Sequence, residues 1–281
     1  MTASMEAAAP EAPAAAAAAA PAAVPAAAPL APRVRLLPAL GAVYRAQLSR
    51  ARVARMPLLF VATFQSLGIL VMMRGVVDSG DNASARAVVA GSSVLVVAFV
   101  ALNLLAQYFG RLRATGGLDH YATLPVPPAA VVLGAAGAYA SFTLPGTLLT
   151  AAAGAAMFGL PWANLWILLA VVPLAGAALS GLGAVCGLLA PRQEIATLLG
   201  QLGMSAALLL GVLPADRMPE AIRLLRDLLP STYGVEAFAR TFDAAPQWSA
   251  VGMDLAVCGV VGLVSLGAAT WAYRRAALAD H

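Results

Sequence analysis

The side chains that could carry covalent or metal chemistry are few and lie far apart in the sequence. The two histidines are His120 and His281, and the two cysteines, Cys186 and Cys258, lie inside apolar runs. No His-Glu-x-x-His, paired-cysteine or Gly-x-Ser-x-Gly motif occurs, so zinc enzymes and serine hydrolases lack their usual machinery. All 17 basic residues are arginine, which excludes a phosphate-loop lysine and a Schiff-base lysine. Any energy source must therefore come from another chain or from an ion gradient.

A second group of polar side chains lies inside apolar stretches, partly at helical spacing. Two of them are four residues apart, and three others follow at i, i+3 and i+7, so each set shares one face of a helix. Such residues cost free energy in lipid unless they have partners, and they mark either hydrogen bonds between helices or a translocation path. Hydrogen bonding between helices is the favoured interpretation, and a translocation path is the alternative. The residues are Gln65, Asn103, Gln107, Glu194, Thr197 and Gln201.

The composition indicates that these side chains belong to a membrane protein. Apolar residues make up 61% of the chain and charged residues 11%, against roughly 45–50% and about 25% in soluble domains. A net charge of +4 would suggest nucleic acid for a soluble protein, but here the arginines flank apolar runs. We expect membrane lipid head groups, and no nucleic acid, to be their counter-charges.

Six apolar stretches are long enough to cross a bilayer as helices. A hydrocarbon core of about 30 Å requires roughly 20 mostly apolar residues in succession. The stretches do not alternate apolar and polar residues, which argues against a β-barrel. The sequence therefore predicts an all-α polytopic membrane protein with six transmembrane helices at residues 57–77, 87–109, 129–158, 165–190, 195–213 and 251–273.

The segment before the first span is predicted to be an interfacial helix. Its apolar residues recur at i, i+4, i+8 and i+11, which is typical of a helix lying on a membrane; they are Leu40, Tyr44, Leu48 and Ala51. Six arginines and no acid lie between Arg33 and Arg55, and each contributes about 1 kcal/mol of attraction to an anionic leaflet. A solvated basic linker is the alternative interpretation.

The arginines also predict the orientation of the spans. The N-terminal flank, the loop with Arg111 and Arg113, the loop with Arg192, and the C-terminal Arg274 and Arg275 all fall on one side of a six-span chain. The intervening short loops carry two arginines balanced by two aspartates, or no charge. Because basic loops stay in the cytoplasm, both termini are predicted to be cytoplasmic.

The long outer loop, residues 214–250, is predicted to form two short amphipathic helices in the outer interface. The first would place apolar residues on one side and charged residues on the other; these are Ile222, Leu225 and Leu229 against Arg223, Arg226 and Asp227. The second would begin at Ser231 as the N-cap, with Glu236 and Arg240 paired at i, i+4.

Small residues in the fourth span predict close helix packing. They recur at spacings that place them on one helix face, where the absence of bulk lets two backbones approach. They are Gly176, Ser180, Gly183 and Gly187.

The cytoplasmic segment 110–128 is the most informative polar stretch. Gly116 and Gly117 are predicted to end the second span, a short helix follows over 118–124, and three prolines end it before the third span. His120 is expected on the surface of that short helix and not as a catalytic base. A soluble partner could bind such a projection, and the candidate contact residues are Arg111, Arg113, Gly117, Leu118, Asp119, His120 and Tyr121.

The order of these features resembles the ABC-2-type transporter permeases, the membrane subunits of bacterial ABC exporters. The resemblance covers about residues 33–275 and rests on the amphipathic N-terminal helix, a coupling segment between spans two and three, and the short outer helices. Residues 117–125 (GLDHYATLP) are similar to the family's coupling segment, and residues 229–233 (LPSTY) to its Leu-Pro and Tyr segment before the final span. Where the family often has a Glu-rich stretch, this chain has Arg111-Leu112-Arg113.

The resemblance implies a homodimer or heterodimer of permeases bound to separate ABC ATPase subunits in a bacterial plasma membrane. The partner would bind ATP, so no cofactor is expected on this chain and it is not expected to be an enzyme. The chain would consist of a disordered Ala/Pro-rich cytoplasmic tail (1–32), a permease domain (33–275) and a cytoplasmic C-terminal tail (276–281). The expected function is outward movement of an amphipathic or lipid-like substrate. A secondary transporter, a membrane-embedded enzyme and a non-catalytic assembly subunit are the alternatives.

Overall fold

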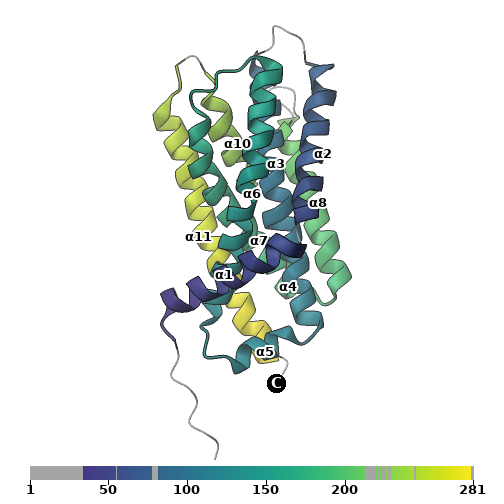
Figure 1. The fold of residues 1–281 in the computed structure, drawn as a ribbon, viewed down its shortest axis with the longest axis vertical. Coiled ribbons are helices and arrows are strands. Elements are labelled where there is room, and N and C mark those ends of the chain that lie inside the picture. The colour runs from purple at the N-terminus through teal and green to yellow at the C-terminus, as the bar shows by residue number, and fades with distance from the viewer. Residues whose placement is uncertain are drawn as a thin grey trace, which may run out of the picture. The chain divides into compact units, whose positions relative to one another are not determined.

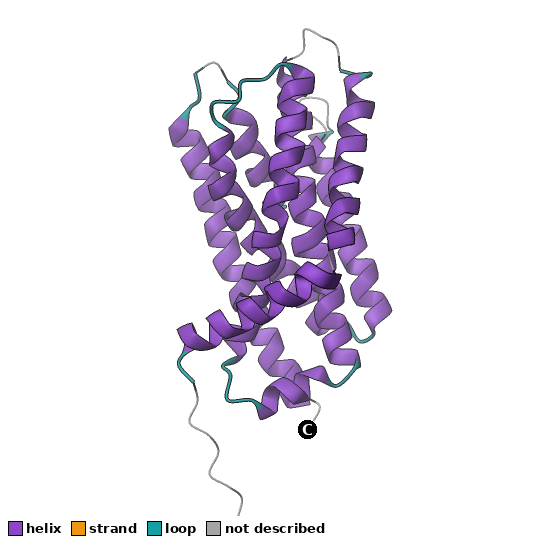
Figure 2. Ribbon diagram, in the orientation of Figure 1, coloured by secondary structure: helices purple, strands orange, loops and turns teal. Residues whose placement is uncertain are grey.

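The computed structural model describes residues 34–54, 56–77, 82–212, 219, 220, 222, 226, 229–243 and 245–279. This part of the chain consists of helices and connecting loops, without a strand (Figure 2). The predicted tail 1–32 lies outside the described residues, and so does most of the first predicted outer helix, including Arg223, Leu225 and Asp227.

Six helices in the described residues are long and apolar enough to cross a membrane, which confirms the predicted all-α polytopic fold. The second span consists of α3 (Asn82–Val97), a π-helical segment η1 (Ala98–Leu104) and α4 (Leu105–Ala114). The fourth joins the short η2 (Leu165–Ile167) to α7 (Leu168–Leu189). The others are α2 (Met56–Arg74), α6 (Pro128–Phe158), α8 (Gln193–Val212) and α11 (Trp248–Ala279).

The amphipathic helix α1 (Leu36–Ala54) runs across the spans and packs against α6 (Figure 1). Its buried face is formed by Ala39, Val43 and Gln47, which lie one helical turn apart. The predicted stripe through Leu40 and Tyr44 lies beside this face and is half-buried. The helix therefore has a face against the bundle and a neighbouring apolar face, which suits a helix at a membrane interface.

The small-residue face of α7 packs directly on the backbone of the second span, as predicted. A Cβ atom on Gly183 would collide with the Leu102 carbonyl oxygen, and one on Gly187 with the Ala106 carbonyl oxygen. Both contacts lie at or next to the π-helical segment. Close packing of this kind replaces the hydrophobic driving force that is missing between helices in lipid.

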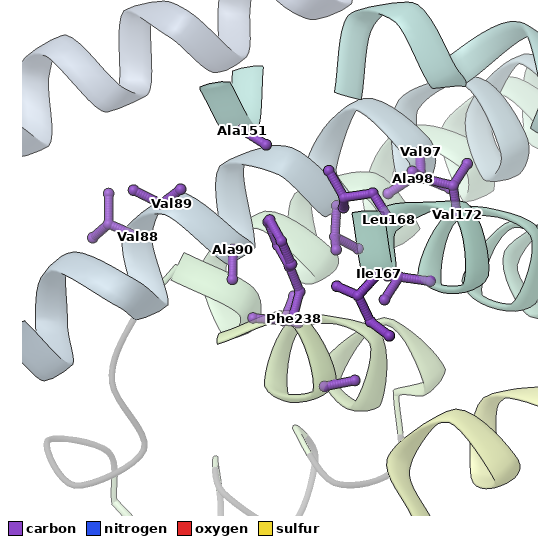
Figure 3. Packing of buried hydrophobic residues seen from close by; sticks show 14 of the residues in the cluster. Val88, Val89, Ala90, Val97, Ala98, Ala151, Ile167, Leu168, Val172 and Phe238 are labelled. Carbon is purple, nitrogen blue, oxygen red and sulfur yellow. The ribbon is translucent and has the colours of Figure 1, made fainter. Parts of the chain in front are cut away.

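The core has two parts, which are called outer and cytoplasmic after the orientation that the arginines predict. In the outer part, Phe238 lies among Val88 and Ala90 of α3 and Ile167 and Leu168 of the fourth span (Figure 3). The cytoplasmic part is a second cluster that includes the most buried large side chains of α4 and of the short helix after it. It joins the spans to the polar cytoplasmic segment.

The outer helix α10 (Pro230–Arg240) differs from the prediction at its start. It begins at Pro230, with Leu229 in an extended conformation before it, so Ser231 is not the N-cap. Proline suits the first helical position because its fixed φ matches the helix and its missing amide loses no bond there. Ser231 is instead buried, and α10 packs against α3, α7 and α11.

Candidate functional site

The short helix α5 (Gly117–Thr123) lies between the second and third spans, within one residue of its predicted position. Gly116 begins it with φ of +68°, a left-handed conformation that glycine adopts without steric cost. Leu124 ends it in an extended conformation, as expected for a segment followed by prolines. The glycines and prolines thus set both ends of α5 and hold it at the end of the bundle (Figure 1).

The side chains of α5 point in different directions. Leu118 is 1% exposed and belongs to the cytoplasmic cluster with Phe109 and Tyr273. Tyr121 is half-buried, whereas Asp119 and His120 are exposed. The helix therefore has an apolar face packed in the bundle and a polar face exposed at the end of the bundle, where a soluble partner could bind it.

A hydrogen-bonded tyrosine joins α5 to the amphipathic helix. The Gln47 amide of α1 donates to the Tyr108 hydroxyl of α4 at 2.5 Å, and the Tyr108 hydroxyl also hydrogen-bonds with Tyr121 of α5. The Tyr108 ring lies 6.1 Å from that of Tyr139 on α6. The sequence-based predictions did not include Gln47 and Tyr108. Gln47 lies one helical turn after the apolar Val43, and this spacing could have indicated that the two residues share a face of α1.

The two arginines before α5 have different roles. Arg113 donates from Nη1 to the carbonyl oxygens of Leu188 and Ala190, at 2.9 and 3.0 Å. These carbonyls end α7, where a helix leaves acceptors without backbone partners and a positive charge is favourable. Arg111 is exposed. Arg113 therefore stabilises the fold, and Arg111 is the one available to a partner.

The polar residues of the second span form a hydrogen-bonded pair. Gln107, which is half-buried, donates to the Asn103 side-chain oxygen at 3.0 Å, and Asn103, in the π-helical segment, is 3% exposed. A Cβ on Gly200 of α8 would lie 2.9 Å from that oxygen, so Asn103 is packed against α8. This hydrogen bond lies within one span, and π-helical segments of this kind often occur at functional sites.

The remaining polar candidates lie on α2 and α8, which with α11 are the three least covered spans. Glu194 and Gln201 of α8 are exposed, and Thr197 donates to the Gln193 carbonyl oxygen at 3.1 Å. Gln65 of α2 is half-buried. Both spans have few buried residues, whereas the second span is almost completely buried. Their exposed faces carry large apolar side chains, among them Phe60, Phe64, Leu198 and Leu202.

An ion-pair network at the outer end was only partly predicted. Glu236 accepts from Arg240 at 3.3 Å, as the spacing predicted, and also from Arg226 at 2.8 Å. Arg240 continues the network to Asp254 of α11, at 3.1 Å. Arg226, expected on the charged side of a short amphipathic helix, is buried and also donates to the Leu210 carbonyl oxygen at the end of α8.

Metal ligands do not gather in the part of the chain that the structure describes. No three His, Cys, Asp or Glu side chains come together there. Cys186 and Cys258 are free thiols on different spans. The described side chains thus offer docking, packing and ion-pair contacts.

The comparisons agree with this arrangement. A family model described as ABC-2 type transporter matches residues 40–242, which is more than half of the chain and includes most of α1 and all of α5 and α10. No curated protein matches the chain. The family consists of membrane components of transporters that associate with an ABC ATPase and dimerise. With its six apolar helices, this chain is a permease subunit embedded in a membrane and belongs to the ABC-2 type transporter family.

Proposed function

We propose that this permease moves an amphipathic or lipid-like substrate outward, driven by ATP that a separate ATPase subunit hydrolyses. The observation that carries the proposal is α5, a short helix fixed in the bundle through Leu118 with Asp119 and His120 exposed. It occupies the place between spans two and three that the family uses for coupling. The permease transmits motion and leaves the chemistry to its partner.

The contacts of α5 provide a route for that motion. A partner that moves Asp119 and His120 would move Leu118, which is packed in the same cluster as Phe109 of α4 and Tyr273 of α11. Because protein interiors are close-packed, such a displacement is passed on and not absorbed. Tyr121 extends the route through Tyr108 to Gln47, so α1 would follow α4.

The predicted contact residues then divide into two groups. Arg111, Asp119 and His120 are exposed, and we assign them to the ATPase surface. Gly117, Leu118, Tyr121 and Arg113 have their contacts within the chain, and we assign them to positioning α5. An exposed Arg111 also favours an acidic side chain on the partner.

The exposed faces of α2 and α8 support a dimer with the substrate path beside them. These exposed apolar faces would be covered by lipid or by a second permease subunit, in a homodimer or a heterodimer. Gln65, Glu194, Thr197 and Gln201 lie on these two spans, and Asn103 packs on α8. A path with so few polar groups suits a substrate that is itself largely apolar.

The test is assembly and transport with the cognate ATPase. Coexpression should give a complex that co-purifies, and the Asp119→Ala/His120→Ala variant should weaken it without changing the yield of folded permease. Glu220→Ala, an exposed acid elsewhere in the described residues, is the matched control. An intact complex after the double substitution would remove the coupling role. ATP-independent transport in vesicles would instead favour a secondary transporter.

A further inference from the structure

A groove of about 250 Å³ lies between α6, α7 and α11, apart from the proposed coupling segment and the proposed substrate path. Its α6 wall extends from Leu133 to Leu144, which is about 16 Å at a rise of 1.5 Å per residue. That length corresponds to about half of a 30 Å hydrocarbon core, which is the depth of one leaflet. Leu169 at the rim is 65% exposed, so the groove is open to the outside of the bundle.

The walls of the groove are almost entirely hydrocarbon. Pro173 of α7 lines it, and Gly137 of α6 leaves space where another residue would place a side chain. The one polar side chain in its lining is Ser141, whose oxygen accepts a hydrogen bond from the Tyr44 hydroxyl at 3.1 Å. A ligand that fills this groove must therefore be a chain of apolar atoms.

A positive charge lies beyond the Leu266 end of the groove. On α11, Leu266 lines the groove, and Thr270 and Arg274 follow it at i+4 and i+8, so Arg274 lies about 12 Å further along the helix. The Arg274 side chain is exposed.

We propose that this groove binds one acyl chain of an anionic phospholipid from the cytoplasmic leaflet, with the phosphate held by Arg274. The charge favours lipid over a second copy of the chain, because a second copy would bring its own arginine-rich cytoplasmic end against Arg274. An anionic head group complements this arginine and is the usual counter-charge for arginines at a membrane surface.

The head-group part is tested by titrating the purified permease with phosphatidylglycerol, and in parallel with phosphatidylcholine, and counting bound lipids by native mass spectrometry. Arg274→Gln should weaken phosphatidylglycerol binding about fivefold, as expected for loss of one cation near a lipid surface. Arg275→Gln is the matched control, since Arg275 is also exposed but stacks over Trp271, 5.5 Å from the ring centre. Equal losses in the two variants would overturn the proposal.

The acyl-chain part is tested by filling the groove. A Cβ on Gly137 would meet the Tyr44 ring at 3.6 Å, which is an ordinary contact, so the Gly137→Leu variant should fold. Its added side chain should abolish binding of phosphatidylglycerol and of phosphatidylcholine in the groove. Gly252→Leu adds the same side chain where nothing lies within 4 Å, and it should leave the binding of both lipids unchanged. The proposal would be overturned if Gly137→Leu left lipid binding unchanged, or if it changed the oligomeric state of the permease and not its lipid binding. If Gly137→Leu does not fold, the comparison of the two exposed arginines decides.

Discussion

Arg240 of α10 lies with its Nε 3.1 Å from Oδ2 of Asp254 on the last span. The Asp254 side chain is only 12% exposed, and Arg240 also bonds to Glu236, which in turn binds Arg226. Through Arg226 the network reaches the Leu210 carbonyl at the end of α8. One chain of charges thus ties α10 to two spans at the outer end of the permease.

Arg240→Gln should destabilise the permease by about 1–3 kcal/mol, because it leaves the Asp254 carboxylate buried without its partner. Thermal unfolding in detergent measures the loss. Adding Asp254→Asn should recover part of it, since the second substitution removes the uncompensated charge. If the double variant were less stable than Arg240→Gln by the full cost of Asp254→Asn alone, the two residues would be acting independently.

Gly183→Ala should destabilise the bundle by about 1–3 kcal/mol, the usual cost of inserting atoms into a close-packed contact. The added methyl group would meet the Leu102 carbonyl oxygen, so α7 and the second span would have to separate. Gly267→Ala on α11 is the control, because nothing lies within 4 Å of its Cβ position. Equal melting temperatures for the two variants would contradict the close packing of α7.

The spans were predictable because length and hydropathy are properties of the sequence alone. The third span was expected at 129–158 and is Pro128–Phe158. The limits of α5 were also predictable, since Gly116 requires a left-handed φ and prolines follow Leu124. In each case the determining residues lie within the element or directly beside its ends.

Contacts between distant residues were not predictable in the same way. Glu236 and Arg240 are four residues apart and were paired correctly, but the bonds to Arg226 and Asp254 depend on how α10 packs. The start of α10 was misplaced because Pro230 at the first helical position outweighs a capping serine. Leu118 was grouped with the exposed residues of α5, and only the packed structure shows it as buried.

Leu118→Ala should reduce the stability of the permease by about 2–5 kcal/mol, since it removes a fully buried side chain from the cytoplasmic cluster. Leu124→Ala makes the same chemical change at a residue that is 40% exposed and should cost much less. Thermal unfolding of the permease without its ATPase separates this effect from docking. A stability equal to that of Leu124→Ala would show that Leu118 does not anchor α5.

Tyr108→Phe should loosen α1 by leaving the Gln47 amide buried without its acceptor, at a cost of about 1–3 kcal/mol. A cysteine at Ala39, on the buried face of α1, should then react faster with a maleimide in a background lacking Cys186 and Cys258. Replacing both partners, Gln47→Met with Tyr108→Phe, should restore slow labelling, because α1 then no longer carries a buried amide without an acceptor. Fast labelling in that double variant would instead indicate loss of packing.

The orientation of the spans can be tested by labelling cysteines in intact cells. The arginine-rich segments flank α5 and both ends of the chain, so the positive-inside rule places α5 in the cytoplasm and the loop after α6 outside. In a cysteine-free background, Trp162→Cys, at a residue 56% exposed in that loop, should react with a membrane-impermeant maleimide in intact cells. His120→Cys should react only after permeabilisation. If His120→Cys reacted in intact cells and Trp162→Cys reacted only after permeabilisation, the arginine-rich segments and α5 would lie outside the cell. The surface assigned to the ATPase would then be out of reach of a cytoplasmic partner.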